Sequence, residues 1–148
     1  MPTEWSREGF LISTDTSRLD RALIAEFLRS SYWAPGIPRE IVDRSIENAL
    51  CFGLYEDSRQ IGFARVITDF ATFAYLSDVF VLESHRGQGL GIWLMEVVMG
   101  HPALQNLRRW MLATRDAHGL YEKFGWRPLS HPERIMEIVV PDIYERRR

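Results

Sequence analysis

The sequence has little cysteine: Cys51 is the only one among 148 residues. A single cysteine excludes a disulfide within the chain and argues against a metal cluster held by cysteine ligands. Because it lies in an apolar run beside Phe52, we expect Cys51 to be a small core residue rather than a nucleophile. The four histidines lack the spacing of a metal-binding motif, so the sequence predicts no metal.

The sequence also lacks long hydrophobic runs and a strong excess of either charge. No stretch approaches the roughly 20 apolar residues of a membrane span, and the first nine residues lack the apolar segment of a signal peptide. Lys and Arg number 18 and Asp and Glu number 20, so the net charge of −2 gives no overall attraction for nucleic acid or an anionic membrane. We therefore expect a cytoplasmic protein that binds neither nucleic acid nor a membrane.

What remains fits one domain that spans residues 1–148. Hydrophobic residues make up 46% of the chain, which is enough for a sizeable core, and no repeat or polar linker divides it. Apolar periodicity, turn residues and a helix cap at Asp116 predict a mixed sheet with helices on its faces. The expected strands are 10–13, 50–55, 60–68, 72–82, 108–114 and 134–140, and the expected helices are 19–28, 38–50, 92–99 and 117–124.

A glycine-rich bend follows the expected strand 72–82, where residues 85–91 read His-Arg-Gly-Gln-Gly-Leu-Gly. A strand that runs through such a bend into a helix presents unpaired backbone N–H groups, which favour an anion such as phosphate. A P-loop needs Lys and then Ser or Thr after its last glycine, but Ile92 and Trp93 follow here. A dinucleotide-binding fingerprint would need glycine at position 92. The alternative is that the glycines only allow a tight turn and close packing of the next helix.

Two motifs in this order carry a resemblance to a known family. Residues 86–91 read Arg-Gly-Gln-Gly-Leu-Gly, and residues 119–126 read Gly-Leu-Tyr-Glu-Lys-Phe-Gly-Trp. The first is similar to the signature of the GNAT superfamily of N-acetyltransferases, and the second resembles that family's Leu-Tyr-Glu-x-x-Gly-Phe segment. The resemblance extends to the element order over nearly the whole chain. It implies an α+β fold with a mixed, mostly antiparallel sheet of six to seven strands and helices on both faces.

The resemblance also implies acetyl-coenzyme A as co-substrate. Its pyrophosphate would contact backbone amides at the bend, and its pantetheine arm would pair with the backbone of Val79, Phe80 and Val81. A free N–H at Val79 would stabilise the oxyanion that forms during acyl transfer. Thr114 stands where many relatives have Asn and is expected to contact the coenzyme. The expected coenzyme-binding residues at the bend are Arg86, Gly87, Gln88, Gly89, Leu90, Gly91 and Ile92.

Two side chains are candidates for proton transfer. The resemblance implies that Tyr121 protonates the leaving thiolate, whereas the alternative is an aromatic core residue. Asp78 lies on the strand beside the expected thioester and is a candidate general base. Alternatively, Asp78 anchors a substrate ammonium or is a buried carboxylate bonded to backbone. Strict strand alternation places Asp78 on one face with Leu76 and Phe80, opposite Val79.

The acceptor substrate is expected beside the first two helices. Tyr32 and Trp33 are candidates for the wall of an acceptor pocket, or they seal the core at a helix end. Arg65 would suit an acceptor that carries a carboxylate, whereas Asp69 and Asp78 together would suit a polyamine.

The sequence predicts an N-acetyltransferase that transfers an acetyl group from acetyl-coenzyme A to the primary amine of a small molecule. Amino acids and polyamines are examples, and the amine would attack directly in a ternary complex. Two alternatives stay open: a peptide or protein N-terminus as acceptor, and a non-catalytic sensor that only binds acyl-coenzyme A. Edge strands allow either a monomer or a homodimer.

Overall fold

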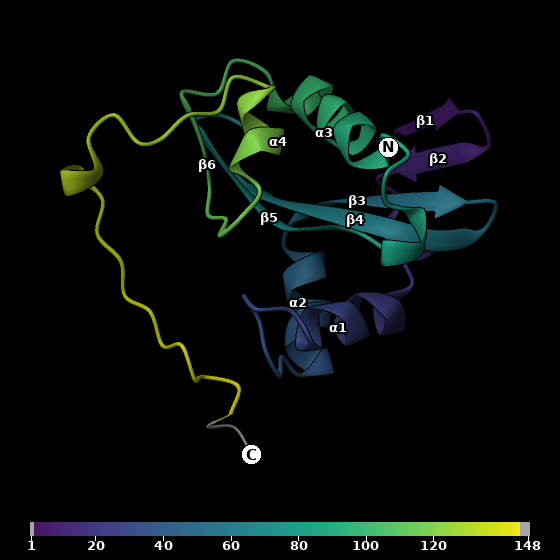
Figure 1. Cartoon of the computed structure of the whole chain (residues 1–148), viewed down its shortest axis with the longest axis horizontal. Coiled ribbons are helices and arrows are strands. Elements are labelled where there is room, and N and C mark those ends of the chain that lie inside the picture. Colours follow the sequence, from purple (N-terminus) through teal and green to yellow (C-terminus); the bar gives the residue numbers. More distant parts are fainter. Residues whose placement is uncertain (1, 146–148) are drawn as a thin grey trace.

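In the computed structural model, which describes residues 2–145, a six-stranded sheet forms the centre of the chain. Its strands are β1 (Glu4–Arg7), β2 (Phe10–Ser13), β3 (Leu50–Glu56), β4 (Arg59–Thr68), β5 (Phe73–Val81) and β6 (Arg109–Leu112). They lie side by side in chain order. Neighbouring strands are antiparallel except β5 and β6, which run parallel because α3 connects them across the sheet (Figure 1).

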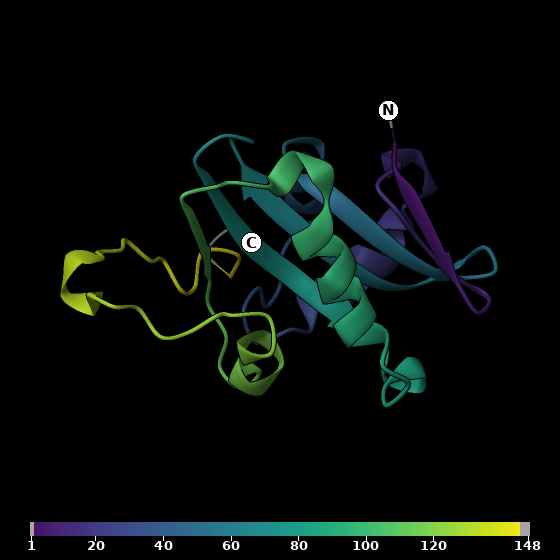
Figure 2. The ribbon, with the colours of Figure 1, turned by 90° about the horizontal axis from the view of Figure 1, so that it is seen from above.

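Helices cover both faces of this sheet. The pair α1 and α2 lies on one face, and α3 and α4 lie on the other (Figure 1), with α3 aligned roughly along the strands that it covers (Figure 2). The expected α+β fold with a mixed, mostly antiparallel sheet is therefore confirmed. The helices are α1 (Arg21–Arg29), α2 (Arg39–Glu47), α3 (Leu90–Gly100) and α4 (His118–Glu122).

Each face has its own apolar core, because the long central strands are buried on both sides. On one face, the side chains of Leu94, Met95 and Val98 of α3 are fully buried against the sheet. On the other face, Ile24 of α1 and Ile46 of α2 pack in a second cluster. The helix α3 leaves only a narrow exposed stripe, as its nearly continuous apolar sequence predicts.

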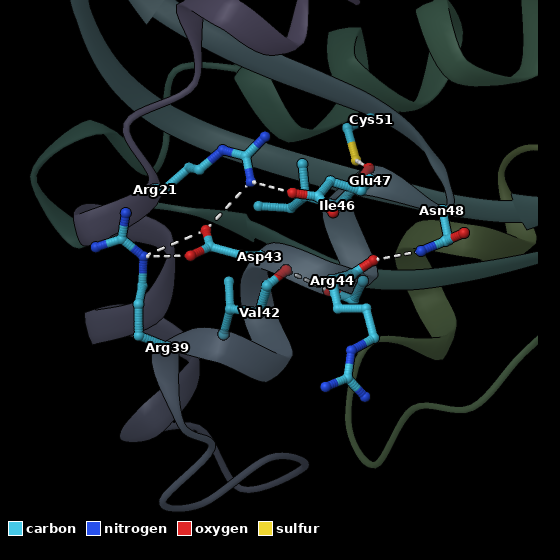
Figure 3. A network of polar contacts seen from close by, with 10 residues as sticks. Arg21, Arg39, Val42, Asp43, Arg44, Ile46, Glu47, Asn48 and Cys51 are labelled. Atoms are coloured by element: carbon cyan, nitrogen blue, oxygen red, sulfur yellow. Dashed lines mark hydrogen bonds and ion pairs between the residues drawn. The ribbon is translucent and has the colours of Figure 1, made fainter.

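Charged side chains tie α1 to α2 at the surface of the second core (Figure 3). The guanidinium of Arg21 lies 3.2 Å from the carboxylate of Asp43 and 3.7 Å from that of Glu47. Arg39 reaches Asp43 from one turn away along α2. The N-terminus of α1 is capped by Asp20, whose carboxylate accepts a hydrogen bond from the third residue of the helix. The contacts of Arg21 therefore hold the N-terminal end of α1 against α2.

The predicted strand at 134–140 is wrong. These residues form no strand, and residues 135–140 extend away from the body of the chain (Figures 1 and 2). The residues of this segment have a high strand propensity, but no neighbouring strand lies beside them to supply hydrogen bonds. The sequence reading also missed β1 (Glu4–Arg7), which is short and polar and pairs with β2 through a turn at Glu8 and Gly9.

The predicted cap of the last helix is also wrong. The residue that caps α4 is Ala117, and Asp116 makes no capping hydrogen bond. Instead, the hydroxyl of Thr114 accepts a hydrogen bond from the Ala117 N–H at 3.1 Å. Asp116 points its carboxylate toward the guanidinium of Arg115 at the surface.

Residues 2–145 contain neither a membrane-spanning helix nor a metal-binding cluster. Within this range, no helix is both long enough and apolar enough to cross a membrane. The same residues contain no cluster of three or more His, Cys, Asp or Glu side chains placed to hold a metal ion.

Candidate active site

The strands β5 and β6 part partway along their length. Their paired residues run from Phe73 beside Arg109 to Leu76 beside Leu112, and the rest of β5 has no partner in β6. A cavity of about 450 Å³ opens where they separate. Where β5 and β6 separate, backbone N–H and C=O groups of β5 are left without a partner strand. A ligand in an extended conformation can form hydrogen bonds with them, as an added strand would. The residues lining the cavity include Tyr32, Trp33, Ser77, Asp78, Val79, Thr114, Arg115 and Tyr121.

A β-bulge in β5 shapes this opening. Phe63 lies opposite Phe80 and Arg65 lies opposite Ser77, so two residues of β5 share the single intervening position of β4. Asp78 adopts φ of 55°, a left-handed conformation that Asp and Asn tolerate better than most residues.

The bulge corrects the predicted alternation along β5. Leu76 packs in the core beneath α3, whereas Phe80 packs in the core beneath α1 and α2, so the two do not share a face. The extra residue in the bulge inverts the order of faces after Ser77. Asp78 does lie opposite Val79, as expected, because Val79 packs beneath α3 and Asp78 contacts residues of the other face.

The glycine turn lies between β5 and α3 and is open toward solvent. Gly87 and Gly89 adopt φ of 80° and 77°, which glycine adopts most readily. A Cβ atom at Gly87, Gly89 or Gly91 would meet nothing within 4 Å. Close packing of α3 therefore does not explain these glycines. Gly91 also lacks a positive φ, so neither packing nor conformation requires a glycine there.

Side chains just before the glycines hold the turn in place. The guanidinium of Arg86 donates a hydrogen bond from Nε to the carbonyl of Val81 at 3.1 Å, so Arg86 ties the turn to the end of β5. His85 is buried, and its Nε2 lies 2.9 Å from Glu56 of β3. The hydroxyl of Ser84 lies 2.7 Å from the other ring nitrogen. The sequence reading gave His85 no role, because its partner is remote in sequence.

Tyr121 lies in the wall of the cavity on the side of α4. Its side chain is buried, with its ring beside that of Trp126. Burial raises the pKa of Tyr121, and the nearby Tyr32 raises this pKa further. Among the described residues, its hydroxyl has no hydrogen-bond partner. A phenol in this state keeps its proton at neutral pH and is available to donate it.

Asp78 lies across the cavity and already has two partners. One carboxylate oxygen accepts a hydrogen bond from Nε of Arg65 at 2.7 Å, and the other accepts one from the indole of Trp33 at 2.9 Å. The side chains of Arg65 and Asp78 are only 15% and 8% exposed. Arg65 also donates to the hydroxyl of Ser77. Any proton transfer to Asp78 would therefore occur at a carboxylate held by two donors.

The loop after α1 closes over the cavity and contacts the loop before α4. The hydroxyl of Tyr32 accepts a hydrogen bond from the backbone N–H of Arg115 at 2.9 Å. The guanidinium of Arg115 lies over the Tyr32 ring, 4.0 Å from its centre. Arg115 was not among the predicted site residues, because its contact depends on two loops that are distant in sequence.

Asp69 has a different environment from Asp78. It lies in the turn between β4 and β5, where its carboxylate accepts hydrogen bonds from the backbone N–H groups of Ala71, Thr72 and Phe73. These bonds, led by the one from Thr72, hold the pKa of Asp69 well below its usual range. The carboxylate is therefore used to shape its own turn.

Comparison with known proteins identifies the family. A model of the acetyltransferase (GNAT) domain matches residues 47–128, which is more than half of the chain. The chain belongs to the GNAT family of acetyltransferases. A Gibberella zeae protein named as a candidate acetyltransferase is 34% identical over 145 residues, covering 82% of this chain and 81% of its own.

Solved structures agree with the GNAT assignment. A candidate GNAT acetyltransferase from Xanthomonas campestris has 51% sequence identity and a TM-score of 0.91, with 94% of this chain and 99% of that chain covered. A candidate acetyltransferase from Clostridium acetobutylicum, solved with acetyl-CoA, has a TM-score of 0.62 over 94% of this chain and 96% of its own. At 13% identity, that second likeness shows a shared fold.

Six of the sixteen predicted site residues line the cavity between β5 and β6, and the predicted residues of the glycine turn do not. The cavity has Val79 on β5, with Thr114 and Tyr121 on the side of β6 and α4, and Tyr32 and Trp33 on the side of α1. Arg65 does not line the cavity but reaches it through Asp78. Phe80 points its side chain away into the other core, where it stacks on Phe27. The roles of these residues stay predictions.

Proposed function

We propose that this GNAT protein transfers an acetyl group from acetyl-coenzyme A to the primary amine of a small molecule. One observation carries the proposal: a protonated, unpartnered tyrosine hydroxyl lies in a cavity that opens where two parallel strands part. Such a cavity offers β5 backbone to an extended ligand and an acid to a leaving group.

The residues present fit acetyl-coenzyme A. The glycine turn offers the first N–H groups of α3 to a pyrophosphate, and Gly91 keeps open a space that nothing in the protein fills. The unpaired stretch of β5, with Val79, Phe80 and Val81, offers backbone groups to the pantetheine arm. When bound, the coenzyme supplies an activated thioester.

Different groups of the protein would assist different parts of acetyl transfer. The N–H of Val79 would stabilise negative charge on the acyl oxygen, and Tyr121 would donate its proton to the departing sulfur. The amine must lose a proton, and Asp78 stays a candidate for accepting it. Because Asp78 is bonded to Arg65 and Trp33, we propose instead that it positions the acceptor side of the cavity and that water removes the proton.

The contact between Tyr32 and Arg115 favours a small acceptor over a protein. It joins the two loops that border the cavity on the side from which the acceptor would enter. A folded protein substrate would have to separate these loops, whereas a small amine would not. The same closed arrangement argues for turnover within a defined pocket rather than for a binding module alone.

Coenzyme binding is the first property to measure. Thermal unfolding would be followed with acetyl-CoA, CoA, ATP and NAD in parallel, because a ligand at 100 times its Kd adds about 2.7 kcal/mol to stability. We expect a shift with the two coenzyme A ligands only. An equal shift with ATP, or none with acetyl-CoA, would overturn the proposal.

A screen of amines would then test transfer by measuring released CoA with a thiol reagent. Cys51 is 1% exposed, and burial raises its pKa to about 12, so the protein itself should give little background. Amino acids, polyamines and short peptides with a free N-terminus would be compared. Binding of acetyl-CoA without thiol release for any amine would favour the sensor alternative. Faster release with peptides than with small amines would favour the peptide acceptor.

A further inference from the structure

The segment 135–140 has the composition of a strand but lies in the open. It reads Ile-Met-Glu-Ile-Val-Val, and these residue types favour strands. Met136 is 93% exposed and Ile138 is 98% exposed. No hydrogen bond from residues 136–139 to any other described residue occurs. Soluble proteins rarely leave five apolar side chains of one six-residue segment in water, so we expect this segment to bind a partner.

The outer edge of β6 lacks a partner strand, just as the segment 135–140 does. This strand pairs with β5 alone and ends the sheet. The backbone N–H of Arg109 points to the carbonyl of Thr72 beside β5. Because successive residues of a strand face opposite ways, the N–H and C=O of Trp110 point outward to the free edge. Open strand edges of this kind readily accept another strand.

A groove with aromatic side chains in its walls runs along this free edge. Its volume is about 460 Å³, and its walls include the aromatic side chains of Trp110, Phe124 and Trp126. Leu129 and Ile135 extend this lining toward the start of the exposed segment. An added strand beside β6 would therefore find apolar side chains at the edge where its own would lie.

The charges of the groove and of the segment are opposite. The groove is lined by four arginines and no acidic residue: Arg108, Arg109, Arg127 and Arg134. Residues 135–145 contain acidic side chains at Glu137, Asp142 and Glu145 and no Lys or Arg. Complementary charge of this kind directs association and fixes which surfaces meet.

We propose that residues 135–140 of a second copy of this chain add a strand to the outer edge of β6, and that the exchange is reciprocal. Each copy has an unpaired β6 edge beside this groove and one unpaired segment, so a two-fold dimer satisfies both at once and closes. Folding back within one chain fits less well. Beyond the segment, Tyr144 packs beside Gly36 against the core under α1 and α2, which leads the chain away from its own groove.

The test compares the wild type with Ile138→Pro and Ile138→Val by sedimentation equilibrium. Proline removes a backbone N–H that the isolated chain does not use, so the fold of each copy should persist, which circular dichroism would check. Valine keeps the N–H and the strand preference, so this variant serves as the matched control. We expect twice the mass of one chain for wild type and Ile138→Val, and the mass of one chain for Ile138→Pro.

Hydrogen exchange at residues 136–139 separates the remaining possibilities. Protection of these amides in the dimer and its loss in Ile138→Pro would support the exchange. Protection in a monomeric wild type would show that the segment pairs within its own chain and would overturn the proposal. A dimer that survives in Ile138→Pro would place the interface elsewhere, and an unprotected monomeric wild type would also overturn it.

Discussion

The glycine turn at residues 86–92 and the bulge at Asp78 lie close in sequence, but the chain forms them in different ways. The turn offers backbone groups and leaves space where side chains would be, since a Cβ at Gly87, Gly89 or Gly91 would meet nothing. The bulge is fixed by side chains from other elements, because Asp78 holds both Arg65 and Trp33. Substitutions at the turn should therefore affect ligand binding, and substitutions at the bulge should affect the fold as well.

The largest effect on activity is expected at Tyr121, which lines the same cavity as Asp78. Replacement of Tyr121 by Phe keeps the ring against Trp126 but removes the acid. Loss of a general acid typically costs two orders of magnitude or more, so we expect turnover to fall about 100-fold. Steady-state kinetics with coenzyme binding measured in parallel would test this. Unchanged turnover would remove Tyr121 from the mechanism.

A large effect on stability is expected at Asp78. Replacement by Ala leaves Arg65 buried without its partner and places alanine in a left-handed conformation. Removing one partner of a buried ion pair costs about 3–5 kcal/mol, and we expect a loss near the lower value because Arg65 retains Ser77. Urea denaturation would measure it.

Asp78→Asn separates the structural role from a catalytic one. Asparagine tolerates the left-handed backbone and can still accept a hydrogen bond from Trp33, so the loss of stability should be smaller than with Ala. If Asp78 only positions the acceptor, the shape of the pH–rate profile should stay the same in this variant. Loss of the rising limb of that profile would instead identify Asp78 as the base.

A smaller effect is expected in the glycine turn. Gly91→Ala should leave stability unchanged or raise it by about 0.5–1 kcal/mol, since alanine favours a helix and meets no neighbour. Its methyl group would enter the space proposed for the pyrophosphate, so we expect coenzyme binding to weaken about tenfold, or about 1.4 kcal/mol. Gly100→Ala, at the other end of α3 and equally free of neighbours, is the matched control. Equal binding by both variants would contradict the assignment of the turn.

This contrast also explains which features the sequence could predict. The glycine turn was visible because missing side chains are themselves a sequence signal, and the strand and helix order followed from apolar periodicity. The contacts of Asp78 with Arg65 and Trp33 join three separated segments, and no local pattern records them. The bulge could not be predicted, because one extra residue does not change the composition of the strand. It nevertheless places Leu76 and Phe80 on opposite faces of the sheet.

The last strand failed for a different physical reason. Its residues have the right propensity, but a strand forms only when another strand supplies hydrogen bonds, and in the single chain none does. Whether a segment of high strand propensity forms a strand therefore depends on a neighbouring strand as well as on its own residues. Cys51 shows the opposite case, because its burial followed from its apolar neighbours alone.

The smallest effect is expected where the two loops meet over the cavity. Tyr32→Phe keeps the ring beneath the Arg115 guanidinium but removes the oxygen that accepts from the Arg115 N–H. A hydrogen bond contributes about 1 kcal/mol net, so the closed arrangement would lose about fivefold in its equilibrium constant. If this closure defines the acceptor pocket, KM for the amine should rise by a few-fold while coenzyme binding stays unchanged. A rise in the coenzyme Kd instead would show that Tyr32 contributes to coenzyme binding. The acceptor side of the cavity and the coenzyme-binding turn would then not act separately.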